Sequence, residues 1–186
     1  MANIPNAITR AEQRIYRNVK LMDGRKVTSG NTVQGTATIT TPAGFLHPRF
    51  MKVTVSSVDQ GLLFKDPSFI REAWPTAATQ GTPRWYSITN ATTLTIAPTP
   101  DAVYAYTLGW YGDGATIVDA SDDTNTSWLG DNAENALLWG SVFEQYLFMK
   151  GSEDLLKSYF DLYTQAEAAL KLESEVSDDR DEYQVV

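Results

Sequence analysis

The sequence predicts an α+β fold, in which an N-terminal helix and a C-terminal antiparallel helical hairpin form a small bundle with an inserted antiparallel β module. Two observations predict this class. Apolar residues recur at helical spacing at both ends of the 186-residue chain, so residues 1–26 and 127–173 are expected to build the bundle. Residues 27–118 are rich in Thr, Val, Tyr and Pro, with turn signals at short intervals, which is typical of β structure.

The first element is a helix near the N-terminus, and Pro5 is compatible with its first turn. Its apolar line consists of Ile4, Ile8, Ala11, Ile15, Val19 and Met22. We expect this line to cover the C-terminal hairpin. Arg10, Arg14 and Arg17 form a stripe on a different face. The stripe is either a solvated helix side or, because so many acidic residues lie elsewhere in the chain, a contact with a neighbouring subunit.

The β module is expected to contain several strands and one short helix. The expected strands are Gln34–Thr41, Phe50–Val58, Arg84–Thr89, Thr93–Ala97 and Ala102–Tyr111. A hairpin turn is predicted at Asn90–Thr92. A second turn is predicted at Pro98–Asp101, because proline is excluded from central strand positions. Asp66 followed by Pro67 indicates the start of a short helix, Phe69–Trp74.

A polar, acidic loop follows the β module, with residues 119–126 as its most acidic part. Its carboxylates Asp119, Asp122 and Asp123 lack the alternating oxygen ligands, the central Gly and the closing Glu of a calcium loop. We therefore expect no metal site. Trp128 and Leu129 are expected to anchor the loop on the bundle.

The helical hairpin is expected to run from residue 131 to about residue 173. Asp131 and Glu134 have the spacing of a capping box. The apolar residues of the first helix cover more of its surface than one partner helix can bury. Gly140 within this helix would cost about 1 kcal/mol relative to Ala, so we expect it to permit close backbone packing. Gly151 ends the helix, and so short a turn joins antiparallel helices.

The net charge of −8 is distributed unevenly. Residues 1–26 are mainly basic, whereas no Lys or Arg lies between Arg84 and Lys150. General nucleic-acid binding is not expected, because neutralising phosphates requires a clustered basic face. The distribution favours a protein that stacks on copies of itself or on a basic partner.

The residue types needed for catalysis are largely missing. The chain has no Cys and a single His, His47, which excludes disulfides, thiolate zinc sites, cysteine nucleophiles and polyhistidine metal sites. It also has no Gly-rich phosphate loop and no hydrolase or metalloprotease motif. We expect no enzyme activity, no catalytic residue and no cofactor. No apolar run is long enough for a membrane span and no signal peptide is evident, so we expect a protein made in the cytoplasm.

Several short segments, taken in chain order, carry a family resemblance. They are Ile4–Ile8, Ala11–Arg17, Gly81–Tyr86, Leu94–Pro100, Tyr106–Tyr111 and Asn125–Leu129. In this order, and over about residues 4–172, the chain resembles the head–tail connector (adaptor) proteins of tailed bacteriophages. Each segment alone is weak, and the ordered combination is more specific.

The resemblance implies a structural protein of the virion, a head-completion component located at the portal vertex. It implies a dodecameric ring that docks under the portal protein, prolongs the DNA channel and presents a surface to a tail or nozzle protein. DNA would pass through without sequence-specific binding. It also implies that a C-terminal arm, residues 174–186, reaches into the portal. Tyr183, Val185 and Val186 are the apolar anchors of this arm, which is otherwise acidic; the alternative is a disordered end.

A ring requires that one patch meets a different patch on the neighbouring copy. The arginine stripe is one candidate patch, and the acidic residues Asp119, Asp122 and Asp123 have the complementary charge. We therefore predict that these two sets form the subunit interface. An acidic channel wall would also let anionic DNA slide without sticking.

A second function remains open at this point. A β-rich tail component would bind a glycan or receptor through an aromatic platform made of Trp85, Tyr86, Trp110 and Tyr111. Alternating aromatic residues on a strand more often belong to a core, and an assay with a soluble sugar separates the two possibilities.

Overall fold

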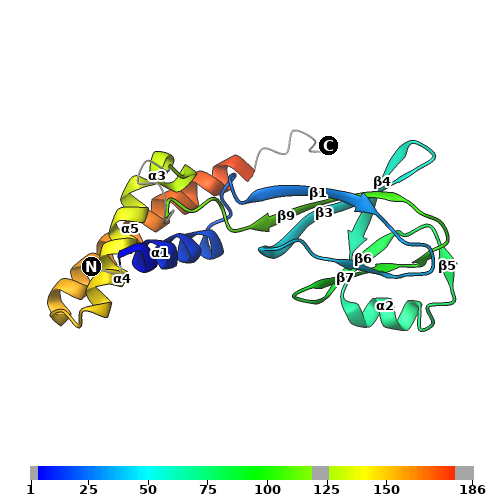
Figure 1. Cartoon of the computed structure of the whole chain (residues 1–186), viewed down its shortest axis with the longest axis horizontal. Helices are drawn as coiled ribbons and strands as arrows, with labels where there is room; N and C mark the ends of the chain where they lie inside the picture. The colour runs from blue at the N-terminus through cyan, green and yellow to red at the C-terminus, as the bar shows by residue number, and fades with distance from the viewer. Residues whose placement is uncertain (1–3, 119–125, 179–186) are drawn as a thin grey trace, which may run out of the picture. The chain divides into compact units, whose positions relative to one another are not determined.

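Helices occupy both ends of the chain and strands occupy its middle in the computed structural model, which describes residues 4–118 and 126–178 (Figure 1). The fold is α+β, as the sequence predicts. The chain divides into a helical unit, residues 1–24 and 113–186, and a β unit, residues 25–112.

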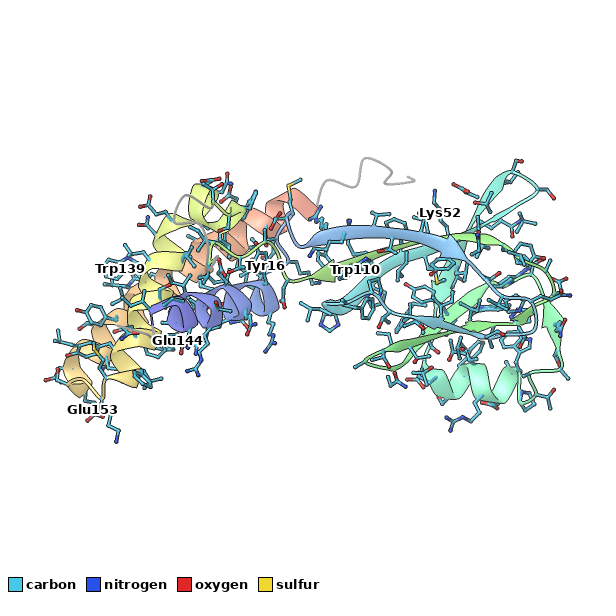
Figure 2. The ribbon with its side chains drawn as sticks, viewed as in Figure 1. Tyr16, Lys52, Trp110, Trp139, Glu144 and Glu153 are labelled. Carbon is cyan, nitrogen blue, oxygen red and sulfur yellow. The ribbon has the colours of Figure 1, made fainter. Side chains whose placement is uncertain are left out.

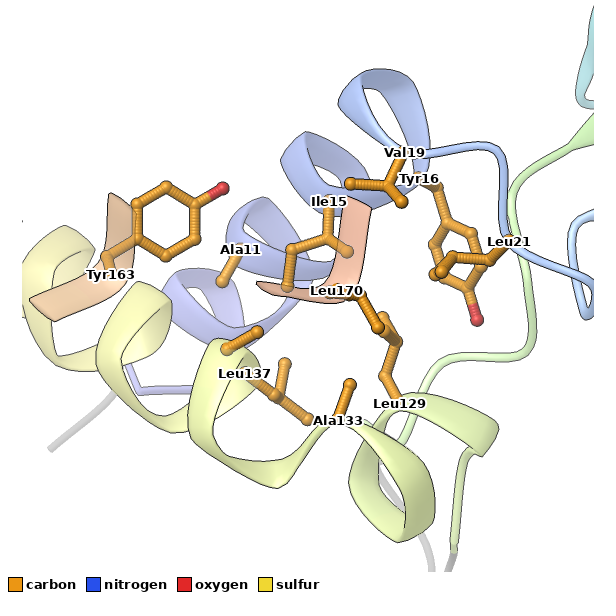
Figure 3. Close-up of a cluster of buried hydrophobic side chains, with 11 residues drawn as sticks. Ala11, Ile15, Tyr16, Val19, Leu21, Leu129, Ala133, Leu137, Tyr163 and Leu170 are labelled. Carbon is orange, nitrogen blue, oxygen red and sulfur yellow. The ribbon is translucent and has the colours of Figure 1, made fainter. Parts of the chain in front are cut away.

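Within the described residues, four helices build the helical unit: α1 (Ile4–Asn18), α3 (Trp128–Asn132), α4 (Glu134–Phe148) and α5 (Glu153–Asp178). They share one cluster of buried apolar side chains (Figure 3): Ala11, Ile15, Tyr16, Val19, Leu21, Leu129, Ala133, Ala136, Leu137, Tyr163 and Leu170. Each large side chain of this kind contributes roughly 1.5–3 kcal/mol when it is fully buried. The predicted packing of the N-terminal helix on the C-terminal hairpin is therefore confirmed.

The helical hairpin begins differently from the prediction, and the predicted capping box is wrong. Asp131 lies inside the short helix α3, and Ala133, which precedes α4, makes no side-chain cap. The cap is Ser127, whose hydroxyl accepts a hydrogen bond from the amide of Gly130 at 3.1 Å. The reason is that Leu129 is fully buried in the core, which fixes a helical turn ahead of α4.

The last helix is longer than predicted. α5 continues to Asp178, so residues 174–178 of the predicted arm are helical. Glu173 and Glu175 are good helix formers, and the Ser174 hydroxyl donates to the carbonyl of Lys171 at 2.9 Å. Residues 179–186 lie outside the described part of the chain.

Gly140 has the role that the sequence predicts. A Cβ atom at this position would lie 3.2 Å from the Cβ of Ala11 and 3.2 Å from the ring of Tyr163. The absence of a side chain thus lets α1, α4 and α5 approach one another closely.

Most strands of the β unit belong to one sheet, with the strand order β1-β9-β3-β4-β6-β7-β2. Their bounds are β1 Arg25–Asn31, β2 Thr38–Thr40, β3 Phe45–Val55, β4 Val58–Phe64, β6 Trp85–Asn90, β7 Thr93–Ala97 and β9 Ala105–Gly112. The short strands β5 (Gln80–Gly81) and β8 (Thr99–Pro100) form a separate pair. One face of the main sheet holds a second core: Ile39, Met51, Val53, Leu62, Tyr86, Leu94, Ile96, Leu108 and Trp110.

The sheet is mixed, whereas the sequence predicts an antiparallel module. β4 pairs in parallel with β6, and β5 pairs in parallel with β8. The helix α2 (Pro67–Ala73) lies in the connection from β4 to β6, and a parallel pair requires a crossover of this kind.

Local signals predicted some elements well and others poorly. The Asp66 carboxylate caps α2 by accepting from the Ser68 amide at 2.8 Å, and the turn after Asn90 is also present. By contrast, β1 and β4 were not predicted. The expected strand Phe50–Val58 runs across a tight turn at Ser56 and Ser57, and the expected turn Pro98–Asp101 contains the short strand β8.

Candidate interaction surfaces

The arginine stripe lies on α1, and its three members have different environments. Arg10 and Arg17 are exposed. Arg14 forms an ion pair with Glu144 of α4, and its guanidinium carbon lies 5.4 Å from the centre of the Phe143 ring (Figure 2). Arg14 is thus engaged within the helical unit, while a contact of the stripe with another subunit remains a prediction.

Glu144 is the ion-pair partner of Arg14, and the sequence did not predict this pairing. Its side chain is only 7% exposed, so the charge of Arg14 compensates a carboxylate that would be costly to bury alone. In the sequence, Glu144 stands out as an acidic residue among the apolar residues of α4. Its partner could not be identified, because the pairing depends on how α1 packs against α4.

Arg17 lies beside a polar hollow between the end of α1 and the middle of α5. The hollow is lined by Arg17, Asn18, Thr164, Glu167, Ala168 and Lys171. The Asn18 side-chain amide donates to Glu167 at 2.6 Å. Two cations and one carboxylate therefore border this surface.

The remaining predicted interface residues cannot be placed. Asp119, Asp122 and Asp123 lie outside the described residues, and so do the arm residues Tyr183, Val185 and Val186. Their assigned roles remain predictions. The acids that directly follow in the described chain, Asp131 and Glu134, are exposed.

A second buried carboxylate, Glu12, holds the segment that leads toward the acidic loop. It accepts hydrogen bonds from the Thr116 hydroxyl at 2.5 Å and from the Ile117 amide at 2.8 Å. Its side chain is 3% exposed. The sequence signal was its position between Ile8 and Ile15, on the apolar side of the helix.

Tyr16 stabilises the same region (Figure 2). Its hydroxyl donates to Asp23 at 2.7 Å. Burial, and then the hydrogen bond to Asp23, raise the pKa of Tyr16 far above its ordinary value. The Tyr16 hydroxyl therefore stays protonated and continues to donate this hydrogen bond. Gly114 lies against the side chains of Tyr16 and Asp23, because a Cβ atom at this position would collide with both. The absence of a side chain at residue 114 thus lets this segment lie close to residue 23.

An apolar groove runs along α4 and the start of α1. Its volume is about 600 Å³, and α5 contributes Tyr159 to its wall. The groove is lined by Leu138, Val142 and Gln145 of α4 and by Met149, which directly follows this helix. The sequence indicated that α4 has more apolar surface than one partner can bury, and the groove is the part that α1 and α5 leave uncovered.

The four aromatic residues of the alternative glycan platform do not form one exposed surface. Tyr86 and Trp110 are buried in the core of the β unit. Trp85 packs on Trp74 with ring centres 4.6 Å apart, and the Arg49 guanidinium lies 5.5 Å from the ring of Tyr111. The platform hypothesis is therefore wrong for Tyr86 and Trp110.

Metal sites and membrane spans can be assessed for the described residues. Among them, no three or more His, Cys, Asp or Glu side chains form a group that could hold a metal ion. In the same part of the chain, no helix is both long enough and apolar enough to cross a membrane.

The chain matches a known protein family over almost its whole length. A family model described as SU10 adaptor protein matches residues 1–185. A search of the curated proteins found no match. The family match covers both the helical unit and the β unit.

Proposed function

Because the chain belongs to the SU10 adaptor protein family, we propose that it acts as a head-to-tail adaptor that joins the portal of a phage particle to its tail. The family is one of structural components of the phage virion, as the sequence resemblance predicts, and is not a class of enzymes. The match over residues 1–185 is the observation that carries the proposal.

The proposed adaptor is a dodecameric ring in which copies contact one another through surfaces of opposite charge. Arg10 and Arg17 are exposed on α1, and the acidic residues Asp119, Asp122 and Asp123 are their proposed partners on the next copy. Exposed ion pairs contribute only about 0–1 kcal/mol each. A ring repeats the same contact at every interface, so small contributions accumulate over the assembly.

Within this proposal, residues 179–186 contact the portal protein, with Tyr183, Val185 and Val186 as apolar anchors. The other end of the ring meets a tail or nozzle protein. The net charge of −8 suits a channel through which DNA passes, because an acidic wall repels phosphates.

Electron cryomicroscopy of the virion, focused on the portal vertex, tests the proposal. The expected result is a ring of this chain between the portal and the tail, with Arg10 and Arg17 of each copy facing acidic residues of the next. Density for the chain only in fibres or at receptor-binding tips of the tail would contradict the proposal.

A further inference from the structure

Residues 114–118, which we call the strap, lie in the helical unit between the end of β9 and the acidic loop and form neither helix nor strand. The backbone–backbone hydrogen bonds between described residues do not include them. The strap is instead bonded to α1 through one side chain: Glu12 accepts from the Thr116 hydroxyl at 2.5 Å and from the Ile117 amide at 2.8 Å. A segment with so few backbone bonds to its surroundings opens at a lower free-energy cost than the helices beside it.

The hydrogen bonds that hold the strap on α1 are concentrated in the Glu12 carboxylate. Glu12 is 3% exposed, so water competes little for its oxygens, and hydrogen bonds to a charged acceptor are stronger than those to a neutral one. The Thr116 hydroxyl also accepts from the Val118 amide at 3.1 Å, which fixes the local turn around Ile117. The strap is therefore a compact turn that is bonded to α1 at one place.

Ile117 gives the strap a second property, because its side chain forms part of the wall of the apolar groove. The side chain packs against the core cluster of the helical unit and lines the groove. Gly130 lines the same groove from α3, and a Cβ atom at this position would lie 3.1 Å from Cδ1 of Ile117. The absence of a side chain at residue 130 thus makes room for Ile117, and the strap covers this part of α3.

We infer that the strap opens independently of the rest of the fold, that Glu12 holds it closed, and that its opening enlarges the apolar groove toward α3. Opening removes Ile117 from the groove wall and exposes the surface at Gly130. The core cluster of α1, α3, α4 and α5 stays intact, because Ile117 packs against this cluster from outside as a partly buried residue. The inference concerns the helical unit alone and does not rest on the proposed ring.

Native-state hydrogen exchange of the full-length chain, resolved to single amides, tests the independent opening. The amide of Ile117 reports on the strap, and the amide of the buried Leu137, which donates to the Ala133 carbonyl at 3.1 Å, reports on unfolding. We expect Ile117 to be less protected than Leu137. We also expect low urea concentrations to leave the exchange of Ile117 almost unchanged and to accelerate that of Leu137, because local opening exposes little surface.

Variants of Thr116 test the role of Glu12 without altering its buried carboxylate. Thr116→Ala removes one of the two donors and is expected to speed the exchange of the Ile117 amide by about tenfold or more, as for a lost hydrogen bond to a charged group. Thr116→Ser keeps the hydroxyl and is expected to retain most of the protection. Thr9→Ala is the matched control, because it removes a hydrogen bond from a hydroxyl on α1 to the Pro5 carbonyl and should leave the exchange of Ile117 unchanged.

A thiol at residue 130 measures access to the enlarged groove, since the chain has no Cys of its own. Gly130→Cys is expected to react slowly with iodoacetamide, because Ile117 covers this position. The reaction should become about tenfold faster when Thr116→Ala is added, in parallel with the faster opening of the strap. Adding Thr9→Ala instead should leave the reaction rate unchanged.

Three results would overturn the inference. Exchange of Ile117 with the urea dependence of Leu137 would show that the strap opens only when the chain unfolds. Equal exchange in Thr116→Ala and the unmodified chain would show that the bonds to Glu12 do not hold the strap closed. Equal reaction of Gly130→Cys with and without Thr116→Ala would show that opening does not enlarge the groove. The proposed function is tested separately, by the position of the chain at the portal vertex.

Discussion

At the scale of single residues, Glu12 illustrates how a buried carboxylate fixes a loop. It accepts from the Thr116 hydroxyl and the Ile117 amide, and a methyl side chain at this position would leave both donors without their acceptor. We expect Glu12→Ala to lower the free energy of unfolding by roughly 1.5–3 kcal/mol, as for lost hydrogen bonds to a charged group. Urea denaturation followed by circular dichroism measures the change.

The neighbouring Gln13 is exposed on the same helix and provides the control. Gln13→Ala is expected to leave the urea midpoint almost unchanged. Equal midpoints for Glu12→Ala and the unmodified chain would show that the carboxylate does not stabilise the fold.

Asp59 links stability to pH in the β3–β4 hairpin. The hydrogen bond from Lys52 at 2.5 Å, and then the one from the Thr54 hydroxyl, hold the pKa of Asp59 below its ordinary value of 3.8 (Figure 2). A depressed carboxyl pKa gives stability that is fully present above the unfolded-state pKa and is lost as the pH falls through the folded-state pKa.

We therefore expect Asp59→Asn to lower the melting temperature at neutral pH. The difference from the unmodified chain should remain constant down to about pH 4 and then shrink at lower pH. Thermal melts over this range measure it. A difference that grows on acidification would contradict the assigned sign.

At the scale of elements, the β3–β4 turn is formed by residues that suit it poorly. Ser56 and Ser57 have φ values of +49° and +65°, which a two-residue turn requires and which Asn and Gly adopt more readily. Replacing the pair by Asn-Gly is expected to raise the free energy of unfolding by about 1 kcal/mol, because the left-handed region costs an ordinary residue roughly 1–2 kcal/mol and the larger entropy of Gly in the unfolded chain offsets part of this gain. Thermal melts measure the gain, and Ala-Ala at the same positions should have the opposite effect.

The same turn explains part of what the sequence could not predict. Without Asn or Gly at its centre, the hairpin lacked a signal, and Val58, Gln60 and Gly61 are exposed with no alternating pattern. β1 is similarly polar and becomes a strand by pairing with β9. β7 and α2 could be predicted because local hydrogen bonds fix their starts. The side chain of Asn90 forms the turn before β7, and the side chain of Asp66 caps α2.

The candidate surfaces were predictable to a similar extent. The spacing of the three arginines places them on one side of α1, but their separate roles depend on tertiary packing. Arg14 reaches Glu144 only because Gly140 lets α1 lie close to α4. The excess apolar surface of α4 was visible in the sequence, whereas the groove depends on which sides α1 and α5 cover.

At the scale of the whole molecule, the β unit has its own core and adjacent ends. Arg25 pairs with Tyr111 across β1 and β9, so the unit enters and leaves at one place. We expect residues 25–112, expressed alone, to fold, because they retain the complete second core. A dispersed amide spectrum in nuclear magnetic resonance and a cooperative melt are the expected results. A spectrum of an unfolded chain would show that the β unit depends on the helical unit.

The C-terminal segment allows a test of the proposed portal contact. The deletion should begin at residue 179 and not at residue 174, because α5 continues to Asp178. Deleting residues 179–186 is expected to leave the melting temperature unchanged and to abolish co-sedimentation with DNA-filled, tailless heads. The control replaces Asp179 and Asp181 with Asn and keeps the apolar anchors. Equal binding by the deleted and full-length chains would remove the segment from the portal contact.

The pairing of Arg25 with Tyr111 also has an evolutionary consequence. Because the β unit is joined to the rest of the chain at two neighbouring points, recombination at two short sites would exchange the whole unit between phage lineages. The packing of α1, α3, α4 and α5 would be inherited unchanged. A lineage that needs a new β unit can therefore acquire one in a single event while its helical unit continues under separate selection.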